Sequence, residues 1–524
     1  MSAPLASSRP GLLLAALLLG APALRAADFN GDGYPDLAIG CHGGWVAAQQ
    51  EAGAVHVFYG GPTCFGSFTE QVIDESSFGG FAFPDDFELF GLSMTSGDFD
   101  GDGYDDLAID AGNEDVSGWD AAGTVFVIYG SPSGLDLERH DAFNQDTKGI
   151  KDKVEPGNFF FPDLSAEQFG RTLVSGDFDA DGYDDLAAFV QETFGKGKKQ
   201  KSFAGAVHII KGSPTGLTVK GNKLLRQGKA GIPGKPTADA KFGWGMAVAD
   251  FNQDGIDDLA IGAPGELVEG HVVILLGKAK KGLTGKHSVL IGEADCGGVP
   301  DPTKAHHFGE MLEVGDFTGS GVPQLVIGAP VLDVGAAEYA GGVYVLTLDP
   351  ADLSISDAQL ITRETPGIAG GVQAGADFGY ALAAGDFDGD GDDDLAIGVP
   401  RDDIGEATDA GTVTVLTGSP AGLVAGDLLV DQDVTGVPEV AEDYDVLGGV
   451  LAAADYDDDG DADLIVGCAG ETVGGASTAG GILVFEGSAG SLLDLAGGLW
   501  LDKSLTVVAG NPGSNDNFGS ALGR

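Results

Sequence analysis

The sequence predicts an all-β fold, a seven-bladed β-propeller of four-stranded antiparallel blades. Three observations predict it: a segment that recurs seven times, short alternating apolar runs within each repeat, and two chain ends that complement each other. The 524 residues include 88 Gly, and 43% of the chain is hydrophobic. This composition supplies a core and many tight turns, so disorder is excluded.

The recurring segment is an acidic turn followed by an apolar run, as in Asp98–Ile109. It begins again, at intervals of 66 to 79 residues, at Asp28, Asp177, Asp250, Asp316, Asp386 and Asp455. A period of this length corresponds to one supersecondary unit. We therefore expect seven such units.

Each unit has the same internal order of predicted strands. The first strand follows a Phe-Gly pair eight residues before the first Asp, at Phe90, Phe169, Phe242, Phe308 and Phe378, with Leu447-Gly448 in the last complete unit. The second follows the acidic turn, as in Leu259–Pro264, and the third alternates, as in Ala122–Tyr129. A Ser-Pro-x-Gly-Leu turn at Ser131, Ser213 and Ser419 leads to the fourth. Period-two alternation between Gly and Pro residues indicates strands.

The two chain ends predict closure of the ring. Asn517–Gly523 has the form of a first strand, but no acidic turn follows it, whereas the Asp28 turn has no Phe-Gly pair before it. The ends would then share one blade, which removes free sheet edges. The alternative is that the chain is a fragment of a longer repeat array.

Residues 1–26 have the pattern of an export signal, with Arg9 before an apolar run and small residues at its end. We expect residues 27–524 to form the propeller domain, and the protein to be secreted, extracellular or periplasmic, without membrane insertion. In an oxidising compartment Cys41 and Cys64, which bracket one predicted hairpin, are the favoured disulfide. The alternative is four buried free thiols, including Cys296 and Cys468.

The acidic turns follow the pattern D-x-D-x-D-G-x-x-D. Side-chain oxygens at positions 1, 3, 5 and 9, with the backbone carbonyl of position 7, suit a hard cation such as Ca²⁺. The expected ligand sets are Asp28, Asn30, Asp32, Tyr34 and Asp36; Asp98, Asp100, Asp102, Tyr104 and Asp106; Asp177, Asp179, Asp181, Tyr183 and Asp185; Asp250, Asn252, Asp254, Ile256 and Asp258; Asp386, Asp388, Asp390, Asp392 and Asp394; and Asp455, Asp457, Asp459, Asp461 and Asp463.

These loops differ from an EF-hand, because Ile109 stands where an EF-hand has Glu and the loop runs into a strand. About six Ca²⁺ sites are expected. The alternative is a solvated acidic turn held by hydrogen bonds between side chains and backbone. The fifth loop, with Asp316, Thr318, Ser320 and Gln324, has lost most of its charge, and we expect it to close by hydrogen bonds without metal.

The Phe-Gly pairs, the acidic loops and the Gly-Ala-Pro turns at Gly262 and Gly328 resemble the FG-GAP repeats of the integrin α-subunit propeller and its secreted bacterial relatives. The resemblance covers about residues 28–524. It implies a seven-bladed propeller with calcium on one face and ligand recognition on the other. The chain differs from animal integrin α chains in having six metal-competent loops.

The net charge of −54 excludes nucleic acid and anionic membranes as partners, because a negative protein gains no counterion-release energy from phosphate. Residues 148–286 nevertheless hold 19 of the 27 Lys and Arg residues. Lys196, Lys198, Lys199 and Lys201 there, with Trp45, Trp119 and Phe159–Phe161 in neighbouring loops, could bind an acidic glycan or a protein; the alternative is loop packing and solvated lysines.

The preferred function is an exported calcium-binding adhesion or ligand-binding module, active as a monomer on a protein or glycan ligand. No catalytic motif of the nucleophile-elbow, zinc-helix or phosphate-loop type is found, so no catalytic residues or organic cofactor are assigned. The second hypothesis is a polysaccharide-active or other hydrolase- or lyase-type propeller enzyme.

Overall fold

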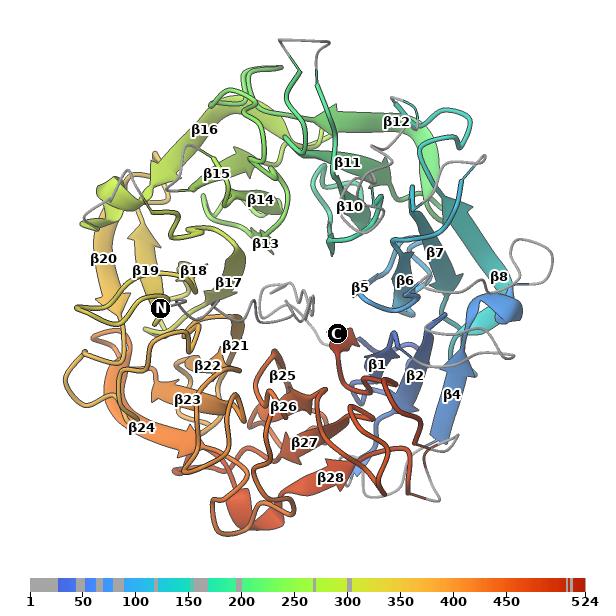
Figure 1. Cartoon of the computed structure of the whole chain (residues 1–524). Helices are drawn as coiled ribbons and strands as arrows, with labels where there is room; N and C mark the ends of the chain where they lie inside the picture. The colour runs from blue at the N-terminus through green and yellow to red at the C-terminus, as the bar shows by residue number, and fades with distance from the viewer. Residues whose placement is uncertain are drawn as a thin grey trace, which may run out of the picture.

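The computed structural model of the chain describes residues 27–43, 52–62, 69–78, 89–116, 121–151, 153, 168–194, 200–266, 270–298, 304–505, 508 and 512–523. Within these ranges the chain forms seven four-stranded antiparallel sheets (Figure 1). The sheets stand side by side around a central axis, in chain order. The predicted seven-bladed β-propeller is confirmed.

Each blade after the first is a continuous stretch of chain whose first strand is innermost. Blade 1 consists of β29 (Ala521–Gly523), β1 (Leu37–Cys41), β2 (Ala54–Tyr59) and β4 (Thr69–Ile73); blade 2 of β5 (Met94–Gly97), β6 (Asp106–Ala111), β7 (Thr124–Tyr129) and β8 (Asp136–Phe143); blade 3 of β9 (Leu173–Gly176), β10 (Asp185–Val190), β11 (Ala206–Lys211) and β12 (Thr218–Leu225); and blade 4 of β13 (Met246–Ala249), β14 (Asp258–Ala263), β15 (His271–Leu276) and β16 (Thr284–Gly292).

The remaining blades repeat this order. Blade 5 consists of β17 (Met311–Gly315), β18 (Gln324–Ala329), β19 (Gly342–Leu348) and β20 (Ile355–Ile361); blade 6 of β21 (Ala381–Gly385), β22 (Asp394–Val399), β23 (Thr412–Thr417) and β24 (Val424–Val430); and blade 7 of β25 (Val450–Ala454), β26 (Asp463–Cys468), β27 (Gly481–Phe485) and β28 (Leu499–Leu501). Short 3-10 helices occupy Glu75–Ser77, Glu293–Cys296 and Leu495–Gly497.

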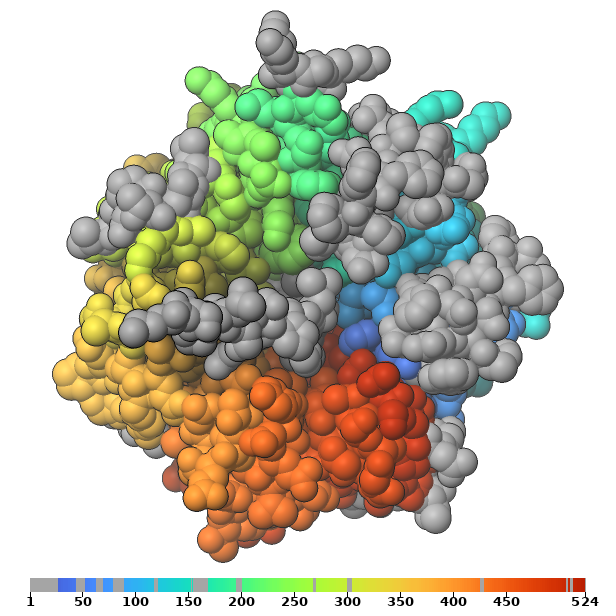
Figure 2. Space-filling view, viewed as in Figure 1, coloured from blue at the N-terminus to red at the C-terminus, as the bar shows by residue number. Residues whose placement is uncertain are grey.

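The ring closes as the two chain ends predicted. The last strand, β29, pairs antiparallel with β1, with Ala38 opposite Gly523 and Gly40 opposite Ala521. The C-terminus therefore lies beside β1 in Figure 1. Blade 1 is built from both ends of the chain, and Figure 2 shows the first and last blades side by side on the surface.

The core lies between neighbouring blades. The second and third strands of blade 2 are buried along their whole length, whereas the outer strand β8 is partly exposed. Side chains of adjacent blades share one cluster, as Ile274 of blade 4 does with Leu325 and Tyr344 of blade 5. The aromatic rings of the Phe-Gly pairs insert into these clusters and are fully buried: Phe90, Phe169, Phe242, Phe308, Phe378 and Phe518. Burial of the apolar faces of neighbouring blades drives assembly of the ring.

The glycine of each Phe-Gly pair packs against the second strand of the preceding blade. A Cβ on Gly262 would lie 1.9 Å from the carbonyl oxygen of Gly309, so no side chain fits there. Blades 2 and 3 have Asp110 and Phe189 at this position of the second strand. The glycines that face them, Gly170 and Gly243, have φ of +102° and +107°. In the other five blades this φ is between +78° and +89°, as in Gly91 and its equivalents Gly309, Gly379, Gly448 and Gly519.

The favoured disulfide is wrong, because Cys41 is a buried free thiol. Its Sγ donates a hydrogen bond to the carbonyl of Asp516 at 3.1 Å, so the thiol faces the chain's C-terminal segment. Cys296 and Cys468 are also buried free thiols, as in the alternative interpretation. Cys64 lies outside the described residues.

Several sequence predictions fall on residues that are not described. They are the export signal at 1–26, the aromatic residues Trp45, Trp119 and Phe159–Phe161, and the lysines Lys196, Lys198 and Lys199. Across the ranges that are described, no helix has the length and apolarity to cross a membrane.

Candidate metal centres

The carboxylate at position 1 organises the backbone of each acidic loop. In blade 2, Asp98 Oδ1 accepts a hydrogen bond from the N–H of Asp102 at 3.1 Å, and its Oδ2 accepts one from Gly103 at 3.1 Å. Gly103 has φ of +92°, a conformation that suits glycine and turns the chain back toward Asp98. The same two bonds recur at Asp28, Asp177, Asp250, Asp386 and Asp455.

The carboxylate at position 9 joins three segments of one blade. Asp106, the first residue of β6, is fully buried and accepts hydrogen bonds from the N–H of Phe99 at 2.9 Å and of Gly130 at 2.8 Å. Gly130 follows the third strand of the blade. Equivalent bonds to the glycine after the third strand are made by Asp36, Asp185, Asp258, Asp394 and Asp463.

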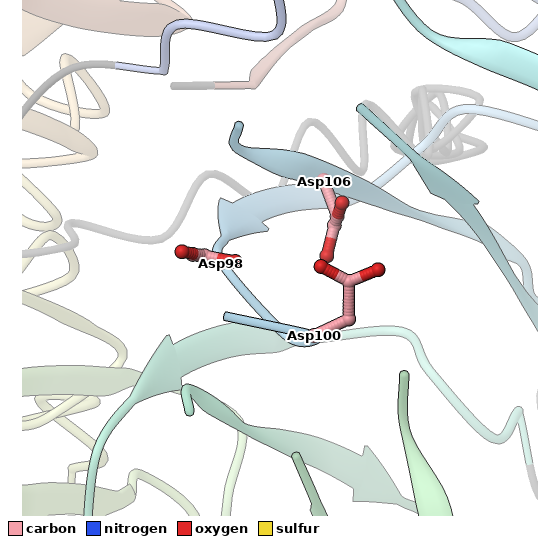
Figure 3. Close-up of side chains that lie close together, drawn as sticks. All are labelled: Asp98, Asp100 and Asp106. Carbon is pink, nitrogen blue, oxygen red and sulfur yellow. The ribbon is translucent and has the colours of Figure 1, made fainter. Parts of the chain in front are cut away.

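Four of the six predicted loops bring three carboxylate oxygens within 4.8 Å of one another. These groups are Asp98, Asp100 and Asp106; Asp177, Asp179 and Asp181; Asp386, Asp388 and Asp394; and Asp455, Asp457 and Asp459. Figure 3 shows the first group, in which Asp100 and Asp106 point toward each other with Asp98 beside them. The other two loops have an amide, Asn30 or Asn252, at position 3.

Buried oxygens without a hydrogen-bond partner lie in these loops. At position 3, one oxygen is buried without a partner in four loops: Asp179 Oδ1, Asn252 Oδ1, Asp388 Oδ1 and Asp457 Oδ1. At position 9, the same is true of Asp185 Oδ2 and Asp258 Oδ2. A buried acceptor without a donor costs free energy unless a cation satisfies it. The loops therefore have the donor atoms of a hard-cation site.

Burial raises the pKa of the position-9 carboxyls. The pKa of Asp106 rises to about 8, chiefly because burial disfavours its charge, and the carboxylates of Asp100 and Asp98 raise it further. The same cause raises the pKa of Asp258 to about 8 and that of Asp36 to about 7. A divalent cation among these groups would reverse the shift, because it stabilises their charged form.

Basic side chains reach two of the six loops, which the sequence analysis did not foresee. The ammonium of Lys211, at the end of β11, pairs with Asp179 and lies 3.4 Å from Asp181 and 4.0 Å from Asp185. The guanidinium of Arg139 in β8 pairs with Asp100 and lies 3.4 Å from Asp102. The six loops therefore differ in the charge next to their carboxylates. In the sequence, Lys211 can be recognised by its position directly before Gly212, whose N–H donates to the position-9 carboxylate.

Aspartates at position 8, which the sequence analysis also passed over, connect the loops of adjacent blades. The N–H of Asp28 donates to Asp105 Oδ2 of the next blade at 2.8 Å, while the N–H of Asp105 donates to the carbonyl of Asp28 at 3.1 Å. Asp184, Asp257 and Asp393 accept the corresponding side-chain bonds. The signal for these residues is the Asp-Asp pair that ends each such loop. These hydrogen bonds therefore couple the backbone conformation of one loop to that of the next.

The fifth loop contains the predicted hydrogen bonds. The N–H of Ser320 donates to Asp316 Oδ1 at 3.0 Å, Thr318 Oγ1 donates to Ser320 Oγ at 2.9 Å, and Gln324 Oε1 accepts from Phe317 N–H at 2.8 Å. Gln324 thus takes the structural place of the position-9 aspartate.

A further acidic group lies outside the loops, between blades 6 and 7. It consists of Glu442, Asp445 and Glu471. Burial raises the pKa of Glu471 to about 8 and that of Asp445 to about 6. The amide of Gln432 donates to Glu471 Oε2 at 2.8 Å, so this group is a polar junction between the blades.

The sequence profile of the FG-GAP repeat matches five segments of the chain: residues 20–58, 90–128, 169–210, 242–276 and 378–416. Each of the last four begins at the aromatic residue of a Phe-Gly pair and continues through the acidic loop into the third strand. The repeat matched by the profile is therefore the first three strands of a blade.

Individual proteins similar to the chain include a phospholipase D and integrin α chains. Phosphatidylinositol-glycan-specific phospholipase D of Rattus norvegicus is 36% identical over 174 residues, covering 31% of this chain and 19% of the relative. Integrin alpha-5 of Xenopus laevis is 29% identical over 238 residues, covering 44% and 20%, and integrin alpha pat-2 of Caenorhabditis briggsae is 26% identical over 344 residues, covering 61% and 24%. The chain thus spans about a fifth of the length of these curated relatives.

Proposed function

We propose that this FG-GAP repeat protein, whose propeller is similar to that of integrin α chains, is an exported calcium-binding module for adhesion or ligand binding. Calcium is structural and lies in the acidic loops, and recognition takes place on the opposite face. The observation that carries the proposal is the set of buried, unpartnered oxygens at position 3 of the loops.

The chemistry of the loops supports Ca²⁺ over other cations. Every candidate ligand is an oxygen from a carboxylate, an amide or a backbone carbonyl, and no loop offers the sulfur or imidazole that zinc and copper prefer. Each loop supplies five candidate ligand residues, which suits the six to eight oxygens around Ca²⁺ once water or bidentate binding completes the shell. The ligands would be the six sets of residues named from the sequence.

The position of the loops supports a structural role for the ion. In blades 2 to 7 the loop joins the innermost strand to the second strand, and in blade 1 it precedes the second strand, β1. In the six acidic loops the position-9 carboxylate also holds the glycine after the third strand. Since position-8 aspartates join loops of adjacent blades, cations in the loops would stabilise the ring as a whole. Six Ca²⁺ ions would change the net charge from −54 to −42.

Recognition is assigned to the face opposite the loops. Connections between the second and third strands, and between blades, lie on that face, and long loops on a rigid scaffold are common sites of recognition. The similarity to integrin α chains supports an extracellular location and a protein ligand. A glycan ligand and a monomeric state remain part of the proposal.

Removal of calcium is the direct test. For a Kd near 10⁻⁴ M and about 2 mM free Ca²⁺, one site stabilises the fold by about 1.8 kcal/mol, and six independent sites by roughly 10 kcal/mol. We expect excess EDTA to lower the melting temperature by more than about 10 °C, and added Ca²⁺, but not added Mg²⁺ at the same concentration, to restore it. Metal analysis of the dialysed protein gives the stoichiometry. A melting temperature that is the same in calcium and in chelator would refute the structural role.

A further inference from the structure

The face opposite the acidic loops carries a ring of seven residues around the central axis, which we call the mouth of the ring. The residue after each Phe-Gly or Leu-Gly pair stands at the start of an innermost strand, and these strands surround the axis (Figure 1). The seven residues are Leu92, Arg171, Trp244, Glu310, Tyr380, Gly449 and Ser520. Because the acidic loop lies at the other end of each innermost strand, this ring lies on the proposed recognition face.

Arg171 is a buried cation of this ring of residues. Its charge acts on His42 of blade 1, Lys241 before blade 4 and Tyr380 of blade 6. Only 5% of the residue is exposed, and its Nε is buried without a hydrogen-bond partner. Among the described residues, no carboxylate lies within 4.0 Å of its guanidinium. Asp110 is the carboxylate that acts on it from farther away.

Two cations lie over the ring of Trp244. The Lys241 ammonium is 4.1 Å from the centroid of its ring, and the Arg171 guanidinium is 5.9 Å from it. The indole Nε1 is buried without a hydrogen-bond partner. Lys241 directly precedes its Phe-Gly pair, where every blade has a residue with positive φ, from +46° to +61°. Donors from three residues therefore gather at one place, and an acceptor for the buried N–H groups is missing among the described residues.

We propose, on the basis of the recognition face assigned above, that Arg171, Lys241 and Trp244 bind a single carboxylate of a peptide ligand at the mouth of the ring. A carboxylate has only acceptors and a negative charge, so it satisfies the guanidinium, the ammonium and the indole N–H together. Burial of the site strengthens these bonds relative to an exposed lysine patch.

The surrounding charge selects a peptide over a polyanion. Glu310, paired with His307 at 2.7 Å, and Asp377, paired with Arg401 at 3.0 Å, lie just before the innermost strands of blades 5 and 6. These acids and the net charge of −54 repel a second anionic group. A uronate or sulfate polymer carries many such groups, whereas a peptide can present one carboxylate beside neutral or basic residues.

Fluorine NMR of the full chain in calcium buffer tests the site. The chain has four Trp, so 5-fluorotryptophan labelling gives few resonances, and Trp244→Phe identifies the one at the mouth. The probe is acetyl-Gly-Glu-Gly-amide, with acetyl-Gly-Gln-Gly-amide as its neutral counterpart. We expect the Glu peptide to shift the Trp244 resonance saturably, with a Kd on the order of millimolar, and the Gln peptide to leave it in place.

Two variants and a matched control assign the effect. Arg171→Gln should weaken the Glu peptide by about tenfold or more, and Lys241→Gln, at a half-buried position, by several-fold. Arg226→Gln removes an arginine stacked 4.5 Å from the ring centroid of Phe194, away from the mouth, and should leave affinity unchanged. Equal shifts by the two peptides, or unchanged affinity in Lys241→Gln, would overturn the proposal.

Glucuronate is the probe that tests whether the carboxylate comes from a glycan. Tighter binding of glucuronate than of the Glu peptide would overturn the peptide assignment in favour of a sugar acid. If neither probe binds while EDTA still lowers the melting temperature, the carboxylate site is wrong and the calcium role stands. The two proposals therefore fail separately.

Discussion

Buried acids at the blade junctions are matched with different partners. In the junction of blades 5 and 6, Asp402 pairs with the Arg363 guanidinium at 3.0 Å. At the equivalent place between blades 6 and 7, Glu471 receives an amide hydrogen bond from Gln432 and stands among other carboxylates. A neutral donor does not compensate the charge of a buried carboxylate, so burial raises the pKa of Glu471 to about 8.

Glu471→Gln should stabilise the protein at alkaline pH. Between its ordinary pKa of 4.5 and about 8, Glu471 keeps a proton in the folded protein that the unfolded chain has lost. The free energy of unfolding therefore falls as pH rises through this window. The glutamine of the variant does not ionise, so this loss of stability is absent. We expect urea unfolding to give equal stability near pH 4.5 and a gain of at least about 1 kcal/mol near pH 8.

The exposed Glu406→Gln is the control for the loss of one negative charge. It should show no gain that grows with pH. A Glu471→Gln variant that is less stable than the wild type at both ends of the window would show that the carboxylate is ionised in the fold.

At this scale the sequence predicted loop carboxylates that lie close together, as they do in four loops, but not their surroundings. Asp98 and Asp106 are eight residues apart in one loop, so their spacing alone places them around one point. Gln432 and Glu471 are in different blades, and nothing in their spacing indicates contact. Arg171 and Trp244 likewise meet only because equivalent positions of successive blades converge on the axis.

The end of the third strand sets the charge next to each loop. The residue before the glycine that binds position 9 is Lys211 in blade 3, Leu276 in blade 4, Thr417 in blade 6 and Glu486 in blade 7. Lys211 pairs with the loop carboxylates, and the Glu486 charge acts on Asp457. This one position would therefore tune the cation affinity of the blade 3, 6 and 7 loops, whose candidate side-chain ligands are all aspartates.

Exchange at this position should change calcium binding in opposite directions. Lys211→Met removes a cation that competes for Asp179, Asp181 and Asp185, so we expect the blade 3 site to bind Ca²⁺ at least about tenfold more tightly. Glu486→Gln should weaken the blade 7 site. Isothermal titration of the calcium-free protein measures both, with Thr417→Val as the neutral control. An unchanged titration for Lys211→Met would show that the ammonium leaves the loop without cost.

The strands themselves were predictable because each carries a local signal. The Phe-Gly or Leu-Gly pair and the Asp turn mark strand limits in every repeat, and the Ser-Pro turn marks them in three repeats. The structure has strands between these signals. The Cys41 pairing failed because a predicted hairpin does not fix which way a strand's last side chain points. Cys41 faces the carbonyl of Asp516 instead.

The ring as a whole is held unevenly from seam to seam. Position 8 is Asp at four seams and Ala462 at the seam of blades 6 and 7, but it is Pro323 at the seam of blades 4 and 5 and Pro35 at the seam of blades 7 and 1. Proline has no N–H to donate and no carboxylate to accept, so neither bond that Asp105 makes can form there. The seam of blades 7 and 1 also depends on β29, which has three residues. It relies on that pairing and on an apolar cluster around Phe518.

Phe518→Ala should therefore open the ring at this seam. Phe518 is fully buried, and its ring meets that of His56 edge to face at 5.2 Å. Loss of the ring removes about 3–5 kcal/mol of packing, and the short β29 cannot compensate for it. Opening would expose the edge of β1, which can pair with another chain. We expect hydrogen exchange to accelerate in β1 and β29 before other strands, and light scattering to detect dimers or larger species.

Phe378→Ala in blade 6 is the matched control, because Phe378 is equally buried and stands at the same place in its repeat. Its seam lies within the continuous chain and has the Asp393 bonds on the loop face. A similar loss of packing there should lower the melting temperature without selective exchange in β1 and without association. If the two variants show the same exchange pattern, covalent continuity does not stabilise the other seams. The seam closed by β29 is then as stable as they are.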